Sequence, residues 1–319
     1  MSNLTAVTAD RKTADLTATR AIAAIRRAFG DPRPLPAEAV WQKPFDYDVT
    51  HLHRLATLSP DAEAEPADLV AYALDFKYEQ IQTNLFLHVL PFCLRAWRED
   101  LTSPFSRYET FVDEFYPALI RGNVFNGELS PEQTAAVGDF MRETILAQID
   151  AQKGLSFKGS KAPVYAWFHA LSTYGLLRRD VDKLWSTWWG VETEGRALAA
   201  AQYASCLIYD ETANPVFDAW TREHGGGPPC LWHYRGHVLE ESWRAENLEV
   251  LEQVLTPDGV RAVLDRSIAR LTGHPLRDKV ASIRFRLDAR TQTLTNRCAD
   301  VRRYLATPNE AEYSFQWSS

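Results

Sequence analysis

Helix-start signals recur along this chain and limit the folds open to it. At five places a residue with a hydrogen-bonding side chain precedes a proline: Ser59-Pro60, Ser103-Pro104, Ser130-Pro131, Asn214-Pro215 and Thr256-Pro257. The first residue of such a pair can cap a helix, and proline suits the first helical position because its absent N–H would have no partner there. Gln133 extends the third pair into a capping box. The pattern predicts repeated helix starts.

The segments that follow these signals have the apolar spacing of amphipathic helices. Between residues 104 and 120, apolar side chains recur at intervals of three and four, with acidic side chains on the other face. No stretch alternates apolar and polar residues as a half-buried strand does. We therefore predict an all-α fold, a large multi-helix bundle of about eleven helices. The predicted helices span residues 14–29, 66–90, 92–100, 104–120, 131–152, 163–175, 179–190, 194–209, 239–254, 257–271 and 276–305.

A chain of 319 residues can form one large domain or two that pack closely. We predict a single all-helical domain over residues 1–319, with 1–155 and 156–319 as two possible halves. An approximate echo, in which CLRAW precedes LSPEQTAAVGDFM and SCLIY precedes LTPDGVRAVLDRS, is compatible with an imperfect duplication of helical units. In the first half, Pro91 is expected to kink or restart the helical pattern of residues 66–90.

One predicted helix is expected to lie at the centre of the bundle. Residues 194–209, EGRALAAAQYASCLIY, are apolar nearly all round. The small side chains of Ala197, Ala200, Ala201 and Ala204 would let neighbouring helices approach closely. Such a sequence is typical of a helix that is buried on several sides.

Composition is that of an ordinary globular protein, with 45% hydrophobic and 24% charged residues. No apolar run approaches the roughly 18 residues that a membrane-spanning helix needs, so we expect no membrane partner. The first thirty residues lack the hydrophobic core and cleavage site of a secretory signal, which favours a cytoplasmic location. Cys93, Cys206 and Cys298 fall within apolar helical patterns, which predicts buried, reduced thiols.

Charge is distributed unevenly along the chain. Residues 261–306 contain eleven Lys and Arg against four Asp, a net +7. Because the whole chain carries −7, the remaining residues carry −14. The long arginine side chains of the basic segment are expected to cover the acidic body or to remain solvated. The acidic overall balance and the lack of interleaved aromatic residues argue against a nucleic-acid partner.

The stretch HGGGPPCLWHYRGH, residues 224–237, contains the strongest candidates for metal ligands. Cys230, His233 and His237 are of residue types that bind zinc. Gly236 and the preceding GGGPP make a regular helix unfavourable there, and no second cysteine pair completes a structural site. We therefore predict a surface connection, anchored by Trp232, without a bound metal.

Other patterns that would indicate a cofactor or a catalytic site are not found in the sequence. None of the eight histidines follows a glutamate by three residues, the spacing that dinuclear carboxylate centres use. Phosphate-binding glycine motifs and the nucleophile elbow GxSxG are also lacking. We therefore expect no cofactor.

The charge imbalance and the lack of catalytic motifs favour a binding function. We interpret the chain as a non-enzymatic cytoplasmic binder, of a bacterial immunity type or a regulatory type, whose acidic surface meets a basic protein partner. The oligomeric state is left open. Acidic residues just before and within a first helical turn are expected to face solvent. The expected binding residues are Asp61, Glu63, Glu65, Asp68, Tyr108, Glu109, Asp113 and Glu114.

The alternative is an enzyme with a buried, aromatic-lined pocket that acts on a hydrophobic small molecule. Many enzymes assemble their sites from scattered residues that form no motif. The candidate pocket residues are Glu79, Gln82, His88, His169, Trp185, Trp189 and Tyr203. The same histidines and tryptophans also fit a hydrogen-bonded, aromatic core.

Overall fold

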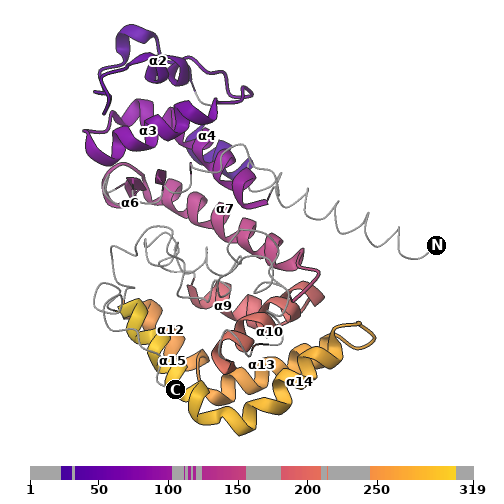
Figure 1. The fold of residues 1–319 in the computed structure, drawn as a ribbon. Coiled ribbons are helices and arrows are strands. Elements are labelled where there is room, and N and C mark those ends of the chain that lie inside the picture. The colour runs from indigo at the N-terminus through magenta and orange to yellow at the C-terminus, as the bar shows by residue number, and fades with distance from the viewer. Residues whose placement is uncertain are drawn as a thin grey trace, which may run out of the picture. The chain divides into compact units, whose positions relative to one another are not determined.

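The computed structural model describes residues 23–30, 33–102, 111, 114–115, 118–119, 124–155, 181–209, 214 and 245–306. Every regular element in these ranges is a helix, which confirms the predicted all-α class (Figure 1). The chain forms two compact units, Met1–Thr144 and Ile145–Ser319. Helix α7, Pro131–Asp150, contains the division. This division lies eleven residues before the position at which the sequence suggested two halves.

The first unit is built around short and medium helices. They are η1 (Ala37–Ala39), α2 (Thr50–Ala56), α3 (Pro66–Tyr78), α4 (Thr83–Thr102), α6 (Val124–Gly127) and the beginning of α7. Helix α2 packs against both α3 and α4, and its Leu52 and Leu55 are fully buried. The sequence did not predict α2, because its seven residues are too few to display a helical period.

The predicted helix over residues 66–90 is in fact two helices, and their break precedes Pro91. Helix α3 ends at Tyr78, Glu79 has an extended backbone, and α4 begins at Thr83. Pro91 lies inside α4 and is buried. The proline removes one backbone hydrogen bond, but the burial of Leu90 and Phe92 stabilises the helix on both sides of it.

The capping signals have mixed outcomes. The predicted capping box is confirmed, since Ser130 N donates to Gln133 Oε1 at 3.0 Å and Gln133 N donates to Ser130 Oγ at 3.2 Å. Thr256 caps α13 (Pro257–Arg270) through a bond from Gly259 N at 3.0 Å. The pair Ser103-Pro104 and the residue Pro215 lie outside the described residues.

Ser59-Pro60 does not start a helix, contrary to the sequence signal. Ser59 O accepts a hydrogen bond from Ala62 N in a turn, and α3 begins only at Pro66. Residues 60–65 therefore connect α2 to α3. A capping pair starts a helix only where the residues after it can bury an apolar face, and those after Pro60 are mostly acidic.

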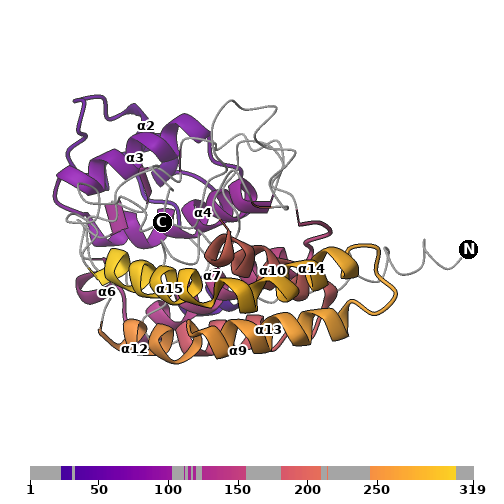
Figure 2. The ribbon, with the colours of Figure 1, turned by 60° about the horizontal axis from the view of Figure 1, so that its bottom comes forward.

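The second unit is organised around one buried helix, α10 (Glu194–Ile208). It contacts α9 (Val181–Trp189), α13, α14 (Arg277–Leu287) and α15 (Thr291–Ala306), and Figure 2 shows α13 and α15 running alongside it. The prediction that this segment is buried on several sides is therefore confirmed. Helix α12, Ala245–Val254, packs against α9 and α15.

The predicted helix over residues 276–305 is two helices, α14 and α15. A 3₁₀ turn, η3 (Asp288–Arg290), separates α14 from α15. Ile283, Leu287 and Leu294 are fully buried, so this segment docks through its apolar side chains. The side chains of Val301 and Leu305 lie outside the described set.

Cys93, Cys206 and Cys298 are buried and unpaired by disulfides, as predicted. Burial raises the pKa of the Cys93 thiol far above its ordinary value, which keeps it protonated. None of the helices in the described ranges has the length and apolar character needed to cross a bilayer.

Candidate functional site

Large apolar side chains are exposed together on one part of the first unit. Among the described residues six such side chains are exposed, and four of them lie between residues 41 and 49: Trp41, Phe45, Tyr47 and Val49. A fifth, Tyr78 at the end of α3, stacks on Phe45 with ring centroids 4.9 Å apart. We call these five side chains the apolar face.

Tyr47 is the most exposed member of the apolar face. Its side chain is 93% exposed, and its backbone has a left-handed φ of 68°. Two aspartates organise the turn around it: Asp46 Oδ1 accepts from Asp48 N at 3.0 Å, and Asp48 Oδ1 accepts from Thr50 N at 2.9 Å. These bonds hold the turn in a conformation that directs Tyr47 into solvent.

Carboxylates lie next to members of the apolar face in the sequence. Asp46, Asp48 and Glu79 are exposed there, as is Lys43. Hydrogen bonds from Thr50 lower the pKa of Asp48, so this carboxylate is ionised at neutral pH. The surface between the aromatic rings is therefore acidic.

Lys77 is also close to the apolar face, but its charge is matched by a carboxylate. Its Nζ lies 5.2 Å from the centre of the Tyr78 ring and 3.0 Å from Glu114 Oε2. Glu114, one of the predicted binding residues, is thus placed next to the apolar face through Lys77.

Buried side chains on α3 and just before α4 hold the backbone of residues 39–45. Gln82 Oε1 accepts from Trp41 N at 2.7 Å, and Gln82 Nε2 donates to Ala39 O at 2.8 Å. Asp75 Oδ1 accepts from Phe45 N at 2.6 Å. The apolar face therefore lies on an ordered segment. Such a segment loses less conformational entropy when a partner binds.

The predicted acidic surface between residues 61 and 68 is exposed in three of its four positions. Asp61, Glu63 and Glu65 are exposed, and Asp61 forms an ion pair with Arg26 at 2.7 Å. Asp68, however, is buried, and both of its carboxylate oxygens are bonded to Arg54. The expectation that Asp68 faces solvent was wrong, because this face of α3 packs against α2.

Tyr108, Glu109 and Asp113, the other predicted binding residues, lie outside the described part of the chain. The apolar face itself was not predicted. Its segment, WQKPFDYDV, has no helical period and places aromatic residues next to Pro44, Asp46 and Asp48. Aromatic residues in a non-helical segment rich in turn residues were the available signal, since such a segment offers few buried positions for them.

The residues of the alternative pocket in the first unit have structural partners. The Gln82 side chain forms hydrogen bonds with backbone groups of residues 39–42. His88 is buried, with Nε2 3.0 Å from Leu55 O, and burial lowers its pKa. Glu79 is exposed. These three side chains therefore do not line a common cavity, and His169 lies outside the described residues.

The other pocket candidates belong to the second unit, where they form a packed aromatic cluster. Trp185 lies 5.5 Å from Trp189 and 5.6 Å from Tyr203, measured between ring centroids. Trp188 contacts all three of them. All four side chains are buried. The rings themselves fill the space between α9 and α10, as in a hydrophobic core.

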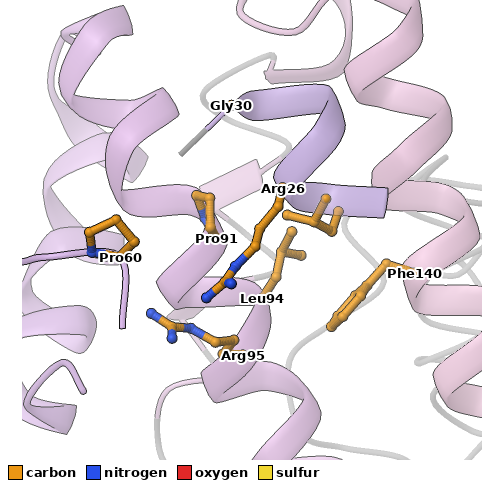
Figure 3. Close-up of a pocket in the computed structure, with 8 residues that line it drawn as sticks. Arg26, Gly30, Pro60, Pro91, Leu94, Arg95 and Phe140 are labelled. Atoms are coloured by element: carbon orange, nitrogen blue, oxygen red, sulfur yellow. The ribbon is translucent and has the colours of Figure 1, made fainter. Parts of the chain in front are cut away.

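A small cavity is present in the first unit (Figure 3). Its volume is about 30 Å³, with apolar walls that include Pro91, Leu94 and Phe140. Arg26 and Arg95 also line it, and they are bonded to Asp61 at 2.7 Å and to Ala62 O at 3.2 Å. This volume suits about one water molecule, whereas pockets for metabolites measure roughly 300–1,000 Å³.

A histidine on α2 and an aspartate on α3 are bonded to each other in the first unit. His51 Nε2 lies 2.6 Å from Asp75 Oδ2, a geometry found in catalytic dyads. Their side chains are only 5% and 1% exposed, so a substrate could not reach them. Within the described ranges, no group of three or more potential ligands could hold a metal ion. Cys230, His233, His237 and Trp232 are not among the described residues.

The fold and its most distinctive surface thus define an all-helical protein with an exposed, acidic and aromatic face. Comparisons with protein-family models, curated proteins and solved structures found no match.

Proposed function

We propose that this chain is a protein-binding module that docks a partner on its apolar face. The observation that carries the proposal is that, among the described residues, five of the six exposed large apolar side chains belong to this face. Single exposed apolar residues are common on soluble proteins, whereas clusters of them are typical of interaction sites. Tryptophan and tyrosine are also the residues that contribute most to binding energy in protein interfaces.

We further propose that the docked surface of the partner is basic. Asp46, Asp48 and Glu79 border the aromatic rings, and Lys77 is paired with Glu114. A lysine- or arginine-rich segment would meet these carboxylates while its apolar parts cover the rings. Arginine suits such a site especially well, because its planar guanidinium can both stack on tyrosine and pair with a carboxylate.

The exposed acids Asp61, Glu63 and Glu65 have a supporting role in this proposal. They lie outside the apolar face, so they attract a basic partner at long range without contributing much to the final affinity. In this proposal the aromatic rings determine the affinity for the partner, and the nearby carboxylates determine the rate of association. In the cytoplasm, which the sequence favours, salt would screen such attraction beyond about 8 Å.

Affinity measurements with matched variants test the proposal. A partner is first captured by cross-linking to the intact chain, then purified, and its binding is measured by calorimetry. Trp41→Ala and Tyr47→Ala should each raise Kd by at least tenfold, since truncation of a central aromatic residue costs about 2 kcal/mol or more. The control Phe285→Ala removes an 83%-exposed ring outside the apolar face and should leave Kd unchanged.

Stopped-flow kinetics separates the two roles. Replacement of Asp46 and Asp48 by lysine should slow association, and the difference from the wild type should shrink as salt is added. Lysine at positions 61, 63 and 65 should slow association while leaving the dissociation rate nearly the same. Normal affinity in the Trp41 and Tyr47 variants would show that the partner binds elsewhere and would overturn the proposal.

A further inference from the structure

Side chains hold the backbone of residues 41–45 by hydrogen bonds at two separate points. The Gln82 side chain holds its beginning, accepting from Trp41 N at 2.7 Å and from Gln42 N at 3.1 Å. Asp75 holds its end, accepting from Phe45 N at 2.6 Å. Phe45 in turn stacks on Tyr78, one turn further along α3. The first fastening is an uncharged amide, whereas the second is a carboxylate.

Asp75 is shared between the apolar face and a histidine. One carboxylate oxygen accepts from Phe45 N, and the other lies 2.6 Å from His51 Nε2 on α2. Both side chains are almost completely buried, 1% and 5% exposed. A buried carboxylate depends on its partners for the stabilisation that water would otherwise provide. The charge on His51 therefore affects the carboxylate that holds Phe45.

Acidic groups outnumber basic ones around His51. Asp75 and Asp68 face it from α3, and Asp46 and Asp48 face it from the segment of the apolar face. Arg54, on the same helix as His51, is bound to Asp68. On α4, His88 is bonded to Leu55 O of α2. Burial lowers the pKa of His51, but the hydrogen bond and charge of Asp75 outweigh it, so the pKa is raised.

We propose that His51 and Asp75 form a proton-dependent anchor for the Phe45 side of the apolar face. With His51 protonated, an imidazolium–carboxylate pair fixes Asp75, which holds the Phe45 amide. When His51 loses a proton, its Nε2–H can still donate to the Asp75 carboxylate, but the attraction between opposite charges is lost and a buried negative charge loses its counter-charge. The Phe45 end then opens more often, while the Gln82 end keeps its bonds. The consequence for partner binding rests on the proposed function, but the anchor itself does not.

Amide hydrogen exchange of the free protein, measured residue by residue by NMR between pH 5.5 and 8.5, tests the anchor. After correction for intrinsic exchange, protection of the Phe45 amide should fall by about threefold to tenfold as pH rises, where tenfold corresponds to one pKa unit of coupling. The amides of Trp41 and Gln42, which Gln82 holds, should show no such step. The midpoint of the step should match the titration of the His51 ring protons in the same sample.

Two variants complete the test. His51→Gln keeps a donor near Asp75 but cannot titrate, so the Phe45 step should disappear. His88→Gln changes the other buried histidine and should retain the step. Equal protection of Phe45 at all pH values, or a step whose midpoint differs from that of the wild-type His51 titration, would overturn the anchor. The midpoint comparison requires no variant and remains decisive if His51→Gln fails to fold.

The two proposals fail in different ways. If Phe45 shows the step but Trp41→Ala and Tyr47→Ala bind the partner normally, the anchor holds and the proposed function is wrong. If those variants lose binding but Phe45 shows no step, the apolar face binds the partner and the anchor is wrong. If both hold, partner affinity should decrease as pH rises through the His51 titration, because the free face is then less preorganised.

Discussion

In the part of the chain that the structure describes, two residues other than glycine adopt a left-handed backbone, and their surroundings differ. Val191 has a φ of 58° and is buried, and its carbonyl oxygen accepts from Arg270 Nε at 3.1 Å. Tyr47 has a φ of 68°, yet its ring is almost fully exposed. Such a backbone costs about 1–3 kcal/mol for a residue with a Cβ atom. At position 191, packing of the buried valine offsets the cost of the left-handed backbone. At position 47, the exposed ring contributes little to the stability of the folded chain.

Replacement of Tyr47 by glycine should therefore separate binding from stability. Glycine adopts a positive φ without steric cost, although it adds entropy to the unfolded chain. We expect the free energy of unfolding to change by no more than about 1 kcal/mol in either direction, as measured by urea denaturation. Partner affinity should fall at least tenfold. A large loss of stability would show that Tyr47 has a structural role instead.

At the scale of elements, the start of α10 lies very close to the end of α7. A Cβ atom on Gly195 would lie 2.2 Å from Asp150 O and 2.5 Å from Ile149 O. Asp150 also accepts from Thr193 Oγ1 at 2.6 Å and pairs with Arg196 at 2.8 Å. A carboxylate at the N-terminus of α10 is favourable for the helix dipole. The sequence directed attention to the alanines of α10, but the closest approach is at its glycine.

Gly195→Ala should consequently destabilise the second unit. The added methyl group meets backbone oxygens that cannot rotate away, so the two helix ends must separate, at a cost of about 3 kcal/mol. Gly154→Ala is the matched control, because nothing lies within 4 Å of the corresponding Cβ position. Thermal denaturation followed by circular dichroism should give a clearly lower Tm for the first variant alone. Similar Tm values for the two variants would contradict this packing.

Three arginines of the basic segment donate to carbonyl groups at the ends of neighbouring helices. Arg266 donates to Trp189 O, at the end of α9, at 3.0 Å. Arg290 donates to Ile208 O, at the end of α10, at 3.3 Å. Arg297 is buried and donates to Cys206 O and Tyr209 O. The last carbonyl groups of a helix have no partner within it and carry partial negative charge, so a guanidinium is well suited to them.

Arg284 and Arg297 should therefore respond very differently to substitution. Arg284 pairs with the exposed Asp265 and Asp288, and such surface pairs contribute at most about 1 kcal/mol. Arg297→Met keeps the apolar stem but leaves two carbonyl groups without their donor, which should cost about 2–3 kcal/mol. Urea denaturation of Arg297→Met and Arg284→Met compares the two directly. Equal stabilities would show that Arg297 contributes no more than a surface residue.

For the whole molecule, the two described buried histidines should give the stability a maximum near pH 6.5. The pKa of His51 is raised above 6.5, so its contribution is complete below pH 6.5 and is lost as pH rises through the folded-state pKa. The pKa of His88 is lowered, mainly by burial, so protonation of the unfolded chain reduces stability as pH falls below 6.5.

Urea midpoints measured from pH 5 to 8.5 check this expectation. His51→Gln should remove the decline on the alkaline side, and His88→Gln should reduce the decline on the acid side. The side chain of glutamine can still donate to Asp75 Oδ2 or to Leu55 O, the atoms to which His51 and His88 are bonded. A wild-type profile that keeps rising above pH 7.5 would contradict the assignment to His51.

The sequence by itself determined the helical class and several of its details. The Ser130–Gln133 capping box, the Thr256 cap and the burial of α10 all follow from residues within one or two helical turns of each other. Caps and apolar periods act through neighbouring residues, so a single sequence is enough to read them. A local capping signal is not sufficient to start a helix, because Ser59-Pro60 begins a turn instead.

Only the tertiary structure decided where side chains meet residues that are distant in the sequence. Gln82, between α3 and α4, bonds to residues 39–42, and the buried Asp68 pairs with Arg54. Trp41, Phe45 and Tyr47 are exposed because their segment runs over the surface of α3. Such pairings depend on how the chain folds back on itself, and local patterns carry no information about that. The helices were therefore largely predictable, whereas the candidate site was not.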